Sequence, residues 1–350
     1  MATYISFQPK DYVNTTLYTG TALSNAITGV GFQPDMTWLK DRTATAYHYL
    51  FDAARGATKG IFPNGTDEEA VNVQYLNAFD ADGFTVGTNT MVNGSTKSYV
   101  SWNWKAGTTS GITTDGSTTI TPSAYSFDAA RGISIIKYTG NNTTGAKLAH
   151  GLGVAPQMVI IKALGSTDNW GGYHVATGGG SAPADYGSSL NTTGAKDDDA
   201  NYWYDTVPDS VNITLGNAAR LNASAGEFIA YCFTSITGYS HISDYRGSGN
   251  ALGPFAYCGF RPSFILMKSD AVNNWHMYDD KRHGYNEENA YLRANSDETE
   301  GDNIEIDIVS NGFKIRTTDA NINASGTVNK FLAFAEFPLV SSNDVPGVAR

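Results

Sequence analysis

Three stretches of the chain alternate large apolar residues with smaller or polar ones at a period of two. They lie at residues 99–104, 228–233 and 331–337, and in the first of them Val100, Trp102 and Trp104 fall on one side of the alternation. Side chains of an extended strand point alternately to opposite faces, so this spacing predicts a β-strand in each stretch. The aromatic content favours the same assignment.

A second pattern also occurs three times. It consists of Gly-x-x-Pro, one further residue, four apolar or Thr positions and a lysine. Proline cannot donate a hydrogen bond to a neighbouring strand, which suits the first residue of a strand, and the apolar run is typical of a strand covered on both faces. We expect the closing lysines to mark the points where these strands reach water; they are Lys40, Lys162 and Lys268.

Both patterns belong to an internal repeat of three segments, each of which begins with Tyr-x-Gly. The Gly-x-x-Pro elements end at Pro34, Pro156 and Pro262, so they lie 122 and 106 residues apart. These spacings exceed the roughly 20–50 residues of solenoid repeats and propeller blades, and they match a β-sandwich of about 100 residues per segment. The sequence therefore predicts an all-β protein with three tandem antiparallel β-sandwich units.

Other local signals add hairpins and a duplicated peptide. Asp82-Gly83 and Asn311-Gly312 precede alternating residues and predict tight hairpin turns. The hexapeptide Phe-Asp-Ala-Ala-Arg-Gly occurs at residues 51–56 and 127–132, at different points of the repeat. We interpret this identity as a coincidence or a local duplication without functional meaning.

The predicted organisation follows from the repeat and from changes in composition. It comprises an N-terminal segment at 1–15, a first unit at 16–105, a linker at 106–132, a second unit at 133–238, a third unit at 239–338 and a tail at 339–350. The linker assignment rests on a run rich in Gly, Ser and Thr. The short junction near residue 238 predicts that the second and third units lie close together.

The composition restricts the classes of function. Only 16% of the residues are charged and 37 are glycine, which excludes a mostly helical protein. The net charge of −11 disfavours binding to nucleic acid or to an anionic membrane, because both need a basic surface. The sequence predicts neither a transmembrane helix nor a secretory signal. Two cysteines are too few for a disulfide scaffold, and the repeat position of Cys258 suggests a buried side chain.

Histidines with aromatic neighbours follow the Gly-x-x-Pro elements. His48 and His276 each lie 14 residues after the proline, and His174 lies 18 residues after it. Aromatic faces beside polar edges suit stacking on sugar rings or contact with another subunit. The candidate binding residues are Tyr47, His48, Trp170, Tyr173, His174, Trp275 and His276. The alternative is a β-strand with one aromatic row facing the core and the histidines on its outer face, since a repeated position often marks packing.

Motifs for catalysis are missing from the sequence. It contains no Gly-x-Ser-x-Gly elbow, no Gly-x-x-x-x-Gly-Lys phosphate loop and no His-Glu-x-x-His. The acidic residues between 270 and 307 lack the spacing of a calcium loop, and we expect them to form a solvated loop. We expect no metal site and no cofactor. A pair of catalytic carboxylates of the glycosidase kind stays open, because their separation depends on the fold.

Taken together, these motifs resemble the repeat units of tailed-phage virion proteins, many of them from marine and cyanobacterial phages. In the first segment the resemblance is carried by residues 18–20, 31–34, 50–59, 66–67, 79–84 and 100–105, and in the second by residues 136–141 and 150–156. It covers residues 15–338 and implies a concanavalin-like or jelly-roll β-sandwich in each unit. Sandwiches of this kind bind glycans or pack into assemblies, and the resemblance implies no catalytic residue.

The expected function is therefore that of a non-enzymatic virion structural protein, a tail-fibre or tail-associated component that contacts host-surface glycans or receptors. Its expected location is the tail or capsid surface of the virion. Expected partners are other virion proteins, copies of the chain in a cyclic homo-oligomer such as a trimer, and host-surface glycans, but neither nucleic acid nor a membrane interior. Two alternatives stay open: a capsid decoration or tail accessory protein that binds only virion proteins, and a polysaccharide-degrading tail enzyme.

Overall fold

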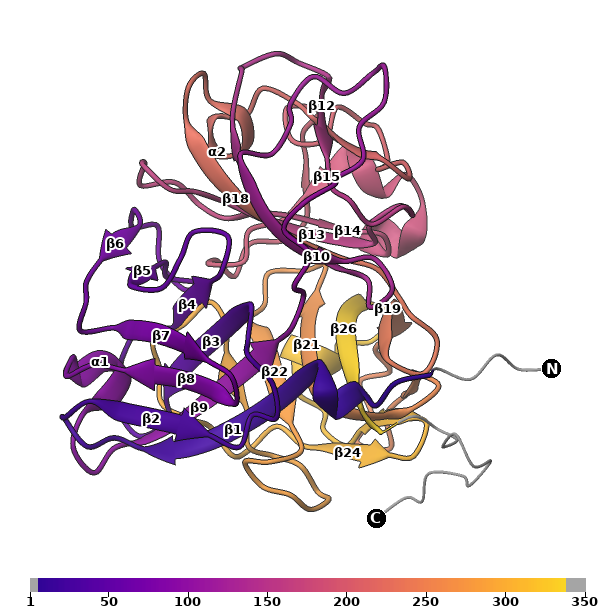
Figure 1. Ribbon diagram of the computed structural model, residues 1–350. Coiled ribbons are helices and arrows are strands. Elements are labelled where there is room, and N and C mark those ends of the chain that lie inside the picture. Colours follow the sequence, from indigo (N-terminus) through magenta and orange to yellow (C-terminus); the bar gives the residue numbers. More distant parts are fainter. Residues whose placement is uncertain (1–5, 338–350) are drawn as a thin grey trace.

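The protein is built from antiparallel β-sheets, as the computed structural model of residues 6–337 shows (Figure 1). The prediction of an all-β protein is confirmed. The described helices are short turns: η1 (Pro9–Asp11), α1 (Thr90–Asn93), η2 (Thr177–Gly180), η3 (Pro183–Asp185), α2 (Ala219–Asn222) and α3 (Ala320–Asn323). The whole predicted tail and the first five residues of the predicted N-terminal segment lie outside the described residues.

Each repeat segment contributes one larger sheet. In the first segment the strand order is β1 (Val13–Thr19), β9 (Ser98–Trp104), β3 (Met36–Asp41) and β4 (Tyr49–Asp52). In the second it is β10 (Ala124–Asp128), β11 (Ile133–Thr139), β18 (Glu227–Phe233), β13 (Met158–Ala163) and β14 (Gly171–His174). In the third it is β19 (Ser240–Arg246), β26 (Val328–Phe337), β21 (Arg261–Ser269), β22 (Trp275–Asp279) and β23 (Leu292–Arg293). The first strand of the second sheet, β10, comes from the range assigned to a linker.

Each segment also contributes a smaller sheet. These are β2 (Asn25–Thr28), β8 (Gly83–Val86) and β7 (Leu76–Asp80); β12 (Ala146–Ala149) and β17 (Asn212–Leu215); and β20 (Phe255–Tyr257), β25 (Gly312–Ile315) and β24 (Ile306–Val309). Two short pairs complete the described strands: β5 (Lys59–Gly60) with β6 (Ala70–Val71), and β15 (Tyr186–Gly187) with β16 (Asp197–Asp198). The predicted hairpins are confirmed, since Asp80 pairs with Gly83 and Val309 pairs with Gly312.

The strand registers confirm the internal repeat. The strand that follows Gly-x-x-Pro lies in each large sheet between the alternating aromatic strand and the next strand along the chain. Trp38 thus pairs with Trp102, Ile160 with Tyr231 and Leu266 with Leu332. The three predicted aromatic strands are β9, β18 and β26, so their assignment is also confirmed.

The Tyr-x-Gly motif has a packing role that is repeated in all three segments. The Tyr18 hydroxyl donates a hydrogen bond to the Val92 carbonyl oxygen in α1 at 2.7 Å, and a Cβ atom on Gly20 would lie 2.1 Å from the Gly94 carbonyl oxygen. Only glycine permits this approach. The equivalent hydrogen bonds run from Tyr138 to Leu221 and from Tyr245 to Ile322.

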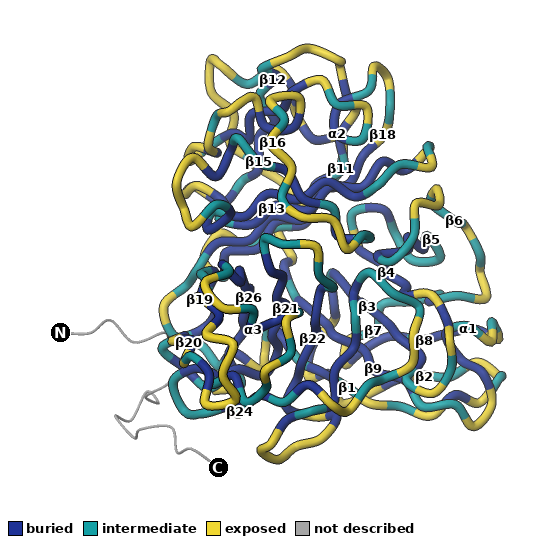
Figure 2. Tube along the Cα trace, turned by 180° about the vertical axis from the view of Figure 1, so that it is seen from behind, coloured by how far each residue is buried: buried dark blue, intermediate teal, exposed yellow. Residues whose placement is uncertain are grey.

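Four hydrophobic clusters hold the sheets together. One cluster lies within each segment and combines residues of its larger and smaller sheets. The fourth is shared, because it joins the faces of the three large sheets that point away from their smaller sheets, with Trp102, Tyr231 and Leu332 among its members. Figure 2 shows these sheet strands buried along most of their length, whereas exposed residues concentrate in peripheral loops. The shared cluster ties the segments together, and the exact boundaries between them stay a prediction.

Candidate functional site

Six of the seven candidate binding residues are buried in the structure. Only Tyr47 is open to solvent, with 39% of its surface exposed. The others are at most 3% exposed; they are His48, Trp170, Tyr173, His174, Trp275 and His276. The structure therefore forms no exposed aromatic surface from these residues, because neighbouring segments and strands cover them.

Three of the buried rings hold the segments to one another in a cycle. The His48 Nε2 atom, in the first segment, lies 3.1 Å from the Arg293 carbonyl oxygen in the third. The Trp170 indole of the second segment donates to the Phe62 carbonyl oxygen in the first at 3.0 Å. The Trp275 indole of the third segment completes the cycle by donating to the Ser189 carbonyl oxygen in the second, also at 3.0 Å. We call these three contacts the ring clamp.

The neighbours of His48 fix its protonation. The Trp38 indole donates a hydrogen bond to His48 Nδ1 at 2.9 Å, so the proton of the neutral ring lies on Nε2 and is directed at the carbonyl oxygen of the clamp. Burial holds the pKa of His48 well below its ordinary value, and the nearby Lys40 acts in the same direction. His48 therefore serves the clamp as a neutral donor.

The three aromatic-flanked histidines are not equivalent, contrary to their spacing in the sequence. Leu39 pairs with Tyr49 in the first segment, whereas the equivalent Met267 pairs with His276, so the third hairpin is one residue shorter. His276 therefore does not occupy the position of His48, although both residues lie 14 residues after the proline. Trp275, not His276, is the counterpart of His48.

The three repeat lysines do not reach water, and the prediction that they solubilise strand ends is wrong. Lys40, Lys162 and Lys268 are at most 2% exposed. Each ammonium group donates to backbone carbonyl oxygens, the shortest bonds being 2.6 Å to Asp41, 2.8 Å to Ala163 and 2.6 Å to Ser269. In the part of the chain that the structure describes, no carboxylate lies within 4 Å of these groups.

Burial changes the protonation of these lysines. It lowers the pKa of Lys40 and Lys162 to about 8 and that of Lys268 to about 7. Burial disfavours the charged form of an amine, and carbonyl dipoles compensate for only part of the lost hydration. The lysines therefore close the ends of the central strands by satisfying carbonyl groups, and their Nζ atoms are not presented to a ligand.

Two buried ion pairs occupy equivalent turns after β4 and β22. Arg55 Nε donates to Asp52 Oδ2 at 2.6 Å, and Arg282 Nε donates to Asp279 Oδ2 at the same distance. All four side chains are completely buried. Each arginine also pairs with a glutamate, Arg55 with Glu69 at 2.9 Å and Arg282 with Glu300 at 3.2 Å. Because an isolated charge is costly in the interior, the buried aspartates depend on these arginines.

Each of these aspartates also accepts a hydrogen bond from a different segment. The Tyr231 hydroxyl of the second segment donates to Asp52 Oδ2 at 2.6 Å, and the Trp102 indole of the first donates to Asp279 Oδ2 at 3.0 Å. Tyr231 and Trp102 hold equivalent positions in β18 and β9. The ion pairs therefore extend the same cycle of contacts as the ring clamp.

The third junction, between the third and second segments, is built differently. The position equivalent to Tyr231 and Trp102 is Leu332, which has no donor, and the position of the aspartate is His174. His174 Nε2 instead lies 3.1 Å from the Phe331 carbonyl oxygen of the third segment. Burial lowers the pKa of His174 to about 3, so a neutral ring stands at the position of the aspartate. The ion pair at this junction is a different one: Lys330 and Asp270 of the third segment lie 3.4 Å apart and bond to Thr177 and Gly178 of the second.

The Asp-x-x-Arg spacing is the sequence signal for these turns, and it does not appear among the predictions above. Both copies of the hexapeptide form the turn, with 2.6 Å between Arg55 and Asp52 and 3.6 Å between Arg131 and Asp128. The third segment uses the same spacing from Asp279. Both copies of the hexapeptide thus form a turn, and the interpretation of their identity as a coincidence or a local duplication without functional meaning stays a prediction.

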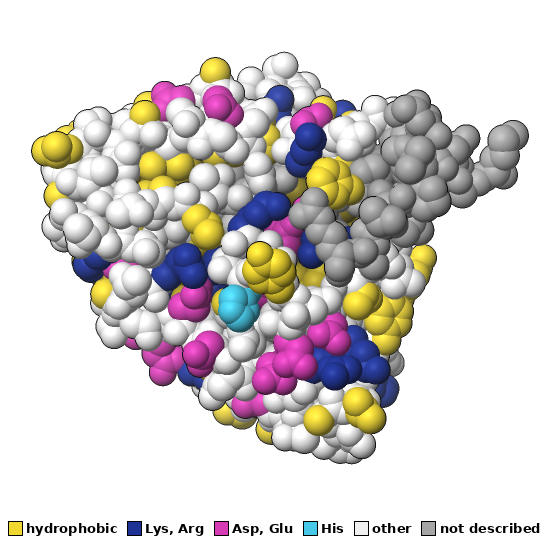
Figure 3. All heavy atoms as spheres, turned by 90° about the horizontal axis from the view of Figure 1, so that it is seen from below, with side chains coloured by type: hydrophobic (Ala, Val, Ile, Leu, Met, Phe, Trp, Pro, Cys, Tyr) yellow, Lys and Arg dark blue, Asp and Glu magenta, His cyan; other side chains and the backbone are white. Residues whose placement is uncertain are grey.

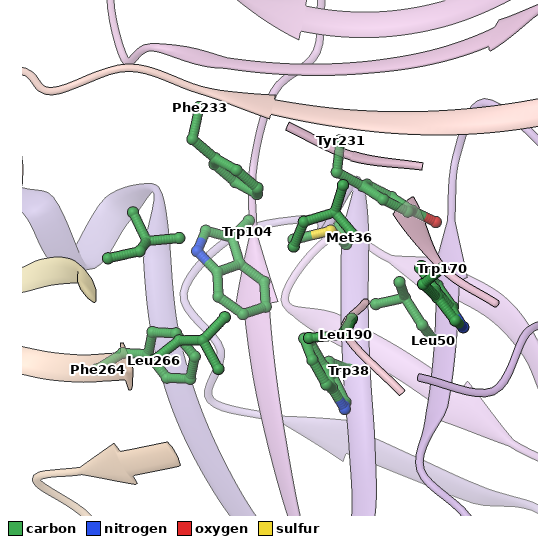
Figure 4. Close-up of a pocket in the computed structure, with 12 residues that line it drawn as sticks. Met36, Trp38, Leu50, Trp104, Trp170, Leu190, Tyr231, Phe233, Phe264 and Leu266 are labelled. Atoms are coloured by element: carbon green, nitrogen blue, oxygen red, sulfur yellow. The ribbon is translucent and has the colours of Figure 1, made fainter. Parts of the chain in front are cut away.

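The interior cavity where the three large sheets meet is too small for an organic ligand (Figure 4). Its volume is about 20 Å³, close to the space that one water molecule needs. Aromatic and aliphatic side chains line it: Met36, Trp38, Leu50, Trp104, Ile160, Trp170, Leu190, Tyr231, Phe233, Phe264, Leu266 and Leu332. It is a packing gap in the shared cluster.

Two larger hollows are open to the surface. One, of about 380 Å³, lies between Glu69 of the first segment and residues of the second, among them Ser166 and Glu227. The other, of about 610 Å³, lies on the second segment and is bordered by the exposed side chains of Val154 and Val207. Neither hollow contains a residue of the candidate set except Tyr173, in the second.

The acidic stretch of the third segment is partly interior, so the expectation of a solvated loop is wrong for several of its residues. Asp279, Asp280 and Glu288 are at most 7% exposed. Burial raises the pKa of Glu288 to about 8 and that of Asp280 to about 7, which reduces their charge at neutral pH. Among residues 6–337, no group of His, Cys, Asp and Glu side chains is arranged to hold a metal ion.

The surface of the protein carries mainly neutral side chains, with basic and acidic side chains interspersed. On the face drawn in Figure 3, basic and acidic side chains lie in mixed groups among neutral ones, and hydrophobic side chains are scattered.

Both cysteines are buried, as predicted for Cys258, and burial raises the pKa of their thiols above the ordinary value.

Comparisons with known proteins give a family but no described function. No helix within the described residues is long and apolar enough to cross a membrane. No curated protein and no solved structure matches the chain. A family model described as a domain of unknown function, DUF7483, matches residues 8–338, and the chain therefore belongs to this family.

Proposed function

We propose that this protein is a non-enzymatic structural component of a bacteriophage particle, a tail-fibre or tail-associated protein that contacts the host surface. The resemblance of its repeat to tailed-phage virion proteins supports this assignment. The resemblance rests on motifs with defined structural roles, such as Tyr-x-Gly, whose tyrosine and glycine both contact a short helix, and Phe-Asp-Ala-Ala-Arg-Gly, which forms the buried Asp–Arg turn.

A finer description of the fold belongs to the same proposal. Each segment is a β-sandwich of the concanavalin-like or jelly-roll type, and the three sandwiches follow one another along the chain. Support comes from the hydrophobic cluster between the larger and smaller sheet of each segment. Two antiparallel sheets that pack through their inner faces are the defining feature of a sandwich.

The observation that carries the proposal is the closed cycle of contacts between the segments. Each segment donates a ring N–H to the next through the ring clamp, and all three contribute to one hydrophobic cluster. A segment cannot separate without breaking contacts on both of its sides. Such mutual support suits a particle component that must stay folded outside the cell.

The proposed partners follow from this role. They are other virion proteins, further copies of the chain in a cyclic oligomer such as a trimer, and glycans of the host surface. Weak sites gain apparent affinity when several copies engage one surface. The low charge density of the chain suits contact with neutral carbohydrate.

Locating the protein tests the proposal. Antibodies against the purified chain should label the tails of particles produced from the phage genome that encodes it. Label confined to the capsid would support a decoration protein and contradict host contact. Absence of the chain from purified particles, or release of reducing ends from a polysaccharide by the pure protein, would contradict the proposal as a whole.

A further inference from the structure

The third small sheet carries two exposed aromatic rings on its outer face. Phe255 and Tyr257 lie two residues apart on β20, so they point to the same side of the sheet, while Ala256 between them points into the core. The two rings are 45% and 58% exposed. Their Cα atoms are about 7 Å apart, as the rise of a strand requires.

The fold does not require aromatic residues at these positions. Ala256 pairs with Phe313, as Ile27 pairs with Phe84 in the first segment and Leu148 with Ile213 in the second. The counterparts of Phe255 and Tyr257 are therefore Ala26 and Thr28 in the first segment, and Lys147 and Ala149 in the second. Small and polar residues serve the same strand there, so the aromatic pair is particular to the third segment.

Glycines leave room for both rings to lie against the protein. A Cβ atom on Gly312 would come within 3.0 Å of ring atoms of Phe255, and one on Gly259 would lie 3.3 Å from the Tyr257 hydroxyl oxygen. Gly259 also has a φ of +79°, which other residues adopt at a cost. The rings are thus supported from below while a large part of each remains open to solvent, so little freedom is lost when a ligand covers them.

Polar groups of both charges flank the rings on the same face. Lys314 lies directly opposite Phe255 on β25, and Asp307 lies opposite Lys314 on β24. Arg316 Nε lies 3.5 Å from Asp307 Oδ2. This arrangement offers donors and acceptors beside two apolar surfaces, and its two basic groups and one acidic group leave a net charge of one.

We propose that the outer face of β20 is a carbohydrate-binding site for neutral glycans. Phe255 and Tyr257 stack on the apolar faces of pyranose rings, whose C–H groups favour the electron-rich face of an aromatic ring. Lys314 and Asp307 hydrogen-bond to the hydroxyl groups at the sugar edges. This site refines the proposed function, on which it rests only for the biological source of the glycan.

The size of the patch favours a glycan over a second copy of the chain. Two half-exposed rings offer about 200 Å² of contact. A stable protein interface needs about 800 Å² from each partner. A short oligosaccharide needs only a few ring-sized contacts, so the patch suits it.

Affinity electrophoresis tests the proposal, with gels that each contain one neutral polysaccharide: mannan, galactan, dextran or hydroxyethyl cellulose. We expect at least one of them to retard the wild-type protein. The double variant Phe255→Ala, Tyr257→Thr, which copies the first segment, should bind it about 30-fold more weakly, as expected for loss of a central aromatic contact. Tyr257→Phe keeps the ring and should bind nearly as well as the wild type.

The controls separate the possible failures. Tyr204→Ala removes a half-exposed tyrosine of the second segment and should leave retardation unchanged. Thermal unfolding should be the same for all variants, because the changed side chains lie on the surface. The proposal is overturned if no polysaccharide retards the wild type, or if the double variant is retarded as strongly as the wild type. It is also overturned if light scattering shows different oligomeric states for the wild type and the double variant, because the patch would then be a contact between copies of the chain. Antibody labelling of particles does not depend on these outcomes and tests the proposed function separately.

Discussion

The three junctions between segments differ in the residues that fill one equivalent position, which is an aspartate at two junctions and a histidine at the third. At two of them a buried Asp–Arg pair accepts a hydrogen bond from an aromatic side chain of another segment. At the third, His174 and Leu332 replace the aspartate and the aromatic donor together. A buried carboxylate needs all of its partners, whereas a neutral imidazole needs only a backbone acceptor, so loss of the donor is tolerated where the charge is also lost.

The largest effect is expected from breaking an ion pair at a charged junction. Asp52→Ala leaves the Arg55 guanidinium buried without its main partner and removes the acceptor for Tyr231. We expect the free energy of unfolding, measured in urea, to fall by about 3–5 kcal/mol. A loss below 1 kcal/mol would show that the pair contributes little to the junction.

A smaller loss should follow removal of the donor alone. Tyr231→Phe keeps the ring in the shared cluster but deletes the hydroxyl that donates to Asp52 at 2.6 Å. Hydrogen bonds to charged groups contribute about 1.5–3 kcal/mol, and we expect a loss in that range in the same urea experiment. Tyr204→Phe, at a half-exposed ring, is the control and should be neutral.

His174 should make the third junction sensitive to acid, as the buried His48 should at the junction of the first and third segments. The pKa of His174 is about 3 in the folded protein and about 6.5 in the unfolded chain, so between these values the unfolded chain binds more protons. The free energy of unfolding should therefore fall as the pH decreases, by about 1.4 kcal/mol per pH unit for this residue.

Replacing His174 by Gln should reduce the slope of stability against pH between pH 6 and 4.5 by about that amount. Leu23→Ala changes a side chain that is 69% exposed and has no titratable group, and it should leave the slope unchanged. An equal slope in the wild type and in His174→Gln would contradict the neutral state of His174 in the folded protein.

The smallest effect is expected for an ion pair at the surface. Asp307 and Arg316 lie 3.5 Å apart with partly exposed side chains. Asp307→Ala should change the free energy of unfolding by no more than about 1 kcal/mol, because water screens such a pair. A loss as large as that of Asp52→Ala would remove the distinction between buried and exposed pairs.

Strands and repeats could be predicted from the sequence because their signals are local. The alternation at β9, β18 and β26 and the turn at Gly83 each depend on a few neighbouring residues. Burial by another segment depends on contacts between residues far apart in the chain, and no local pattern reports it. Lys162, for example, donates to the Thr66 carbonyl oxygen of a different segment, which its own strand could not reveal.

The candidate site was mispredicted for two physical reasons. His276 and His48 lie equally far from their prolines, which suggested that they are equivalent. The third hairpin is one residue shorter, however, so His276 pairs with Met267 and is the counterpart of Tyr49. Aromatic residues next to histidines suit an outer surface as well as a core, and in the structure Trp170 and His48 face other segments. The Asp-x-x-Arg spacing was visible in the sequence and would have indicated the charged junctions.

The shared cluster constrains how the repeats can diverge. Trp104, Phe233 and Phe334 hold equivalent positions where the three large sheets converge, and the gap left among the converging side chains is only about 20 Å³. Side chains of all three segments share the space at this point, so a larger side chain in one segment must be matched by a smaller one in another. Mutations at these positions can therefore accumulate only in compensating sets, while the outer strands, such as β20, are free to acquire new residues one segment at a time.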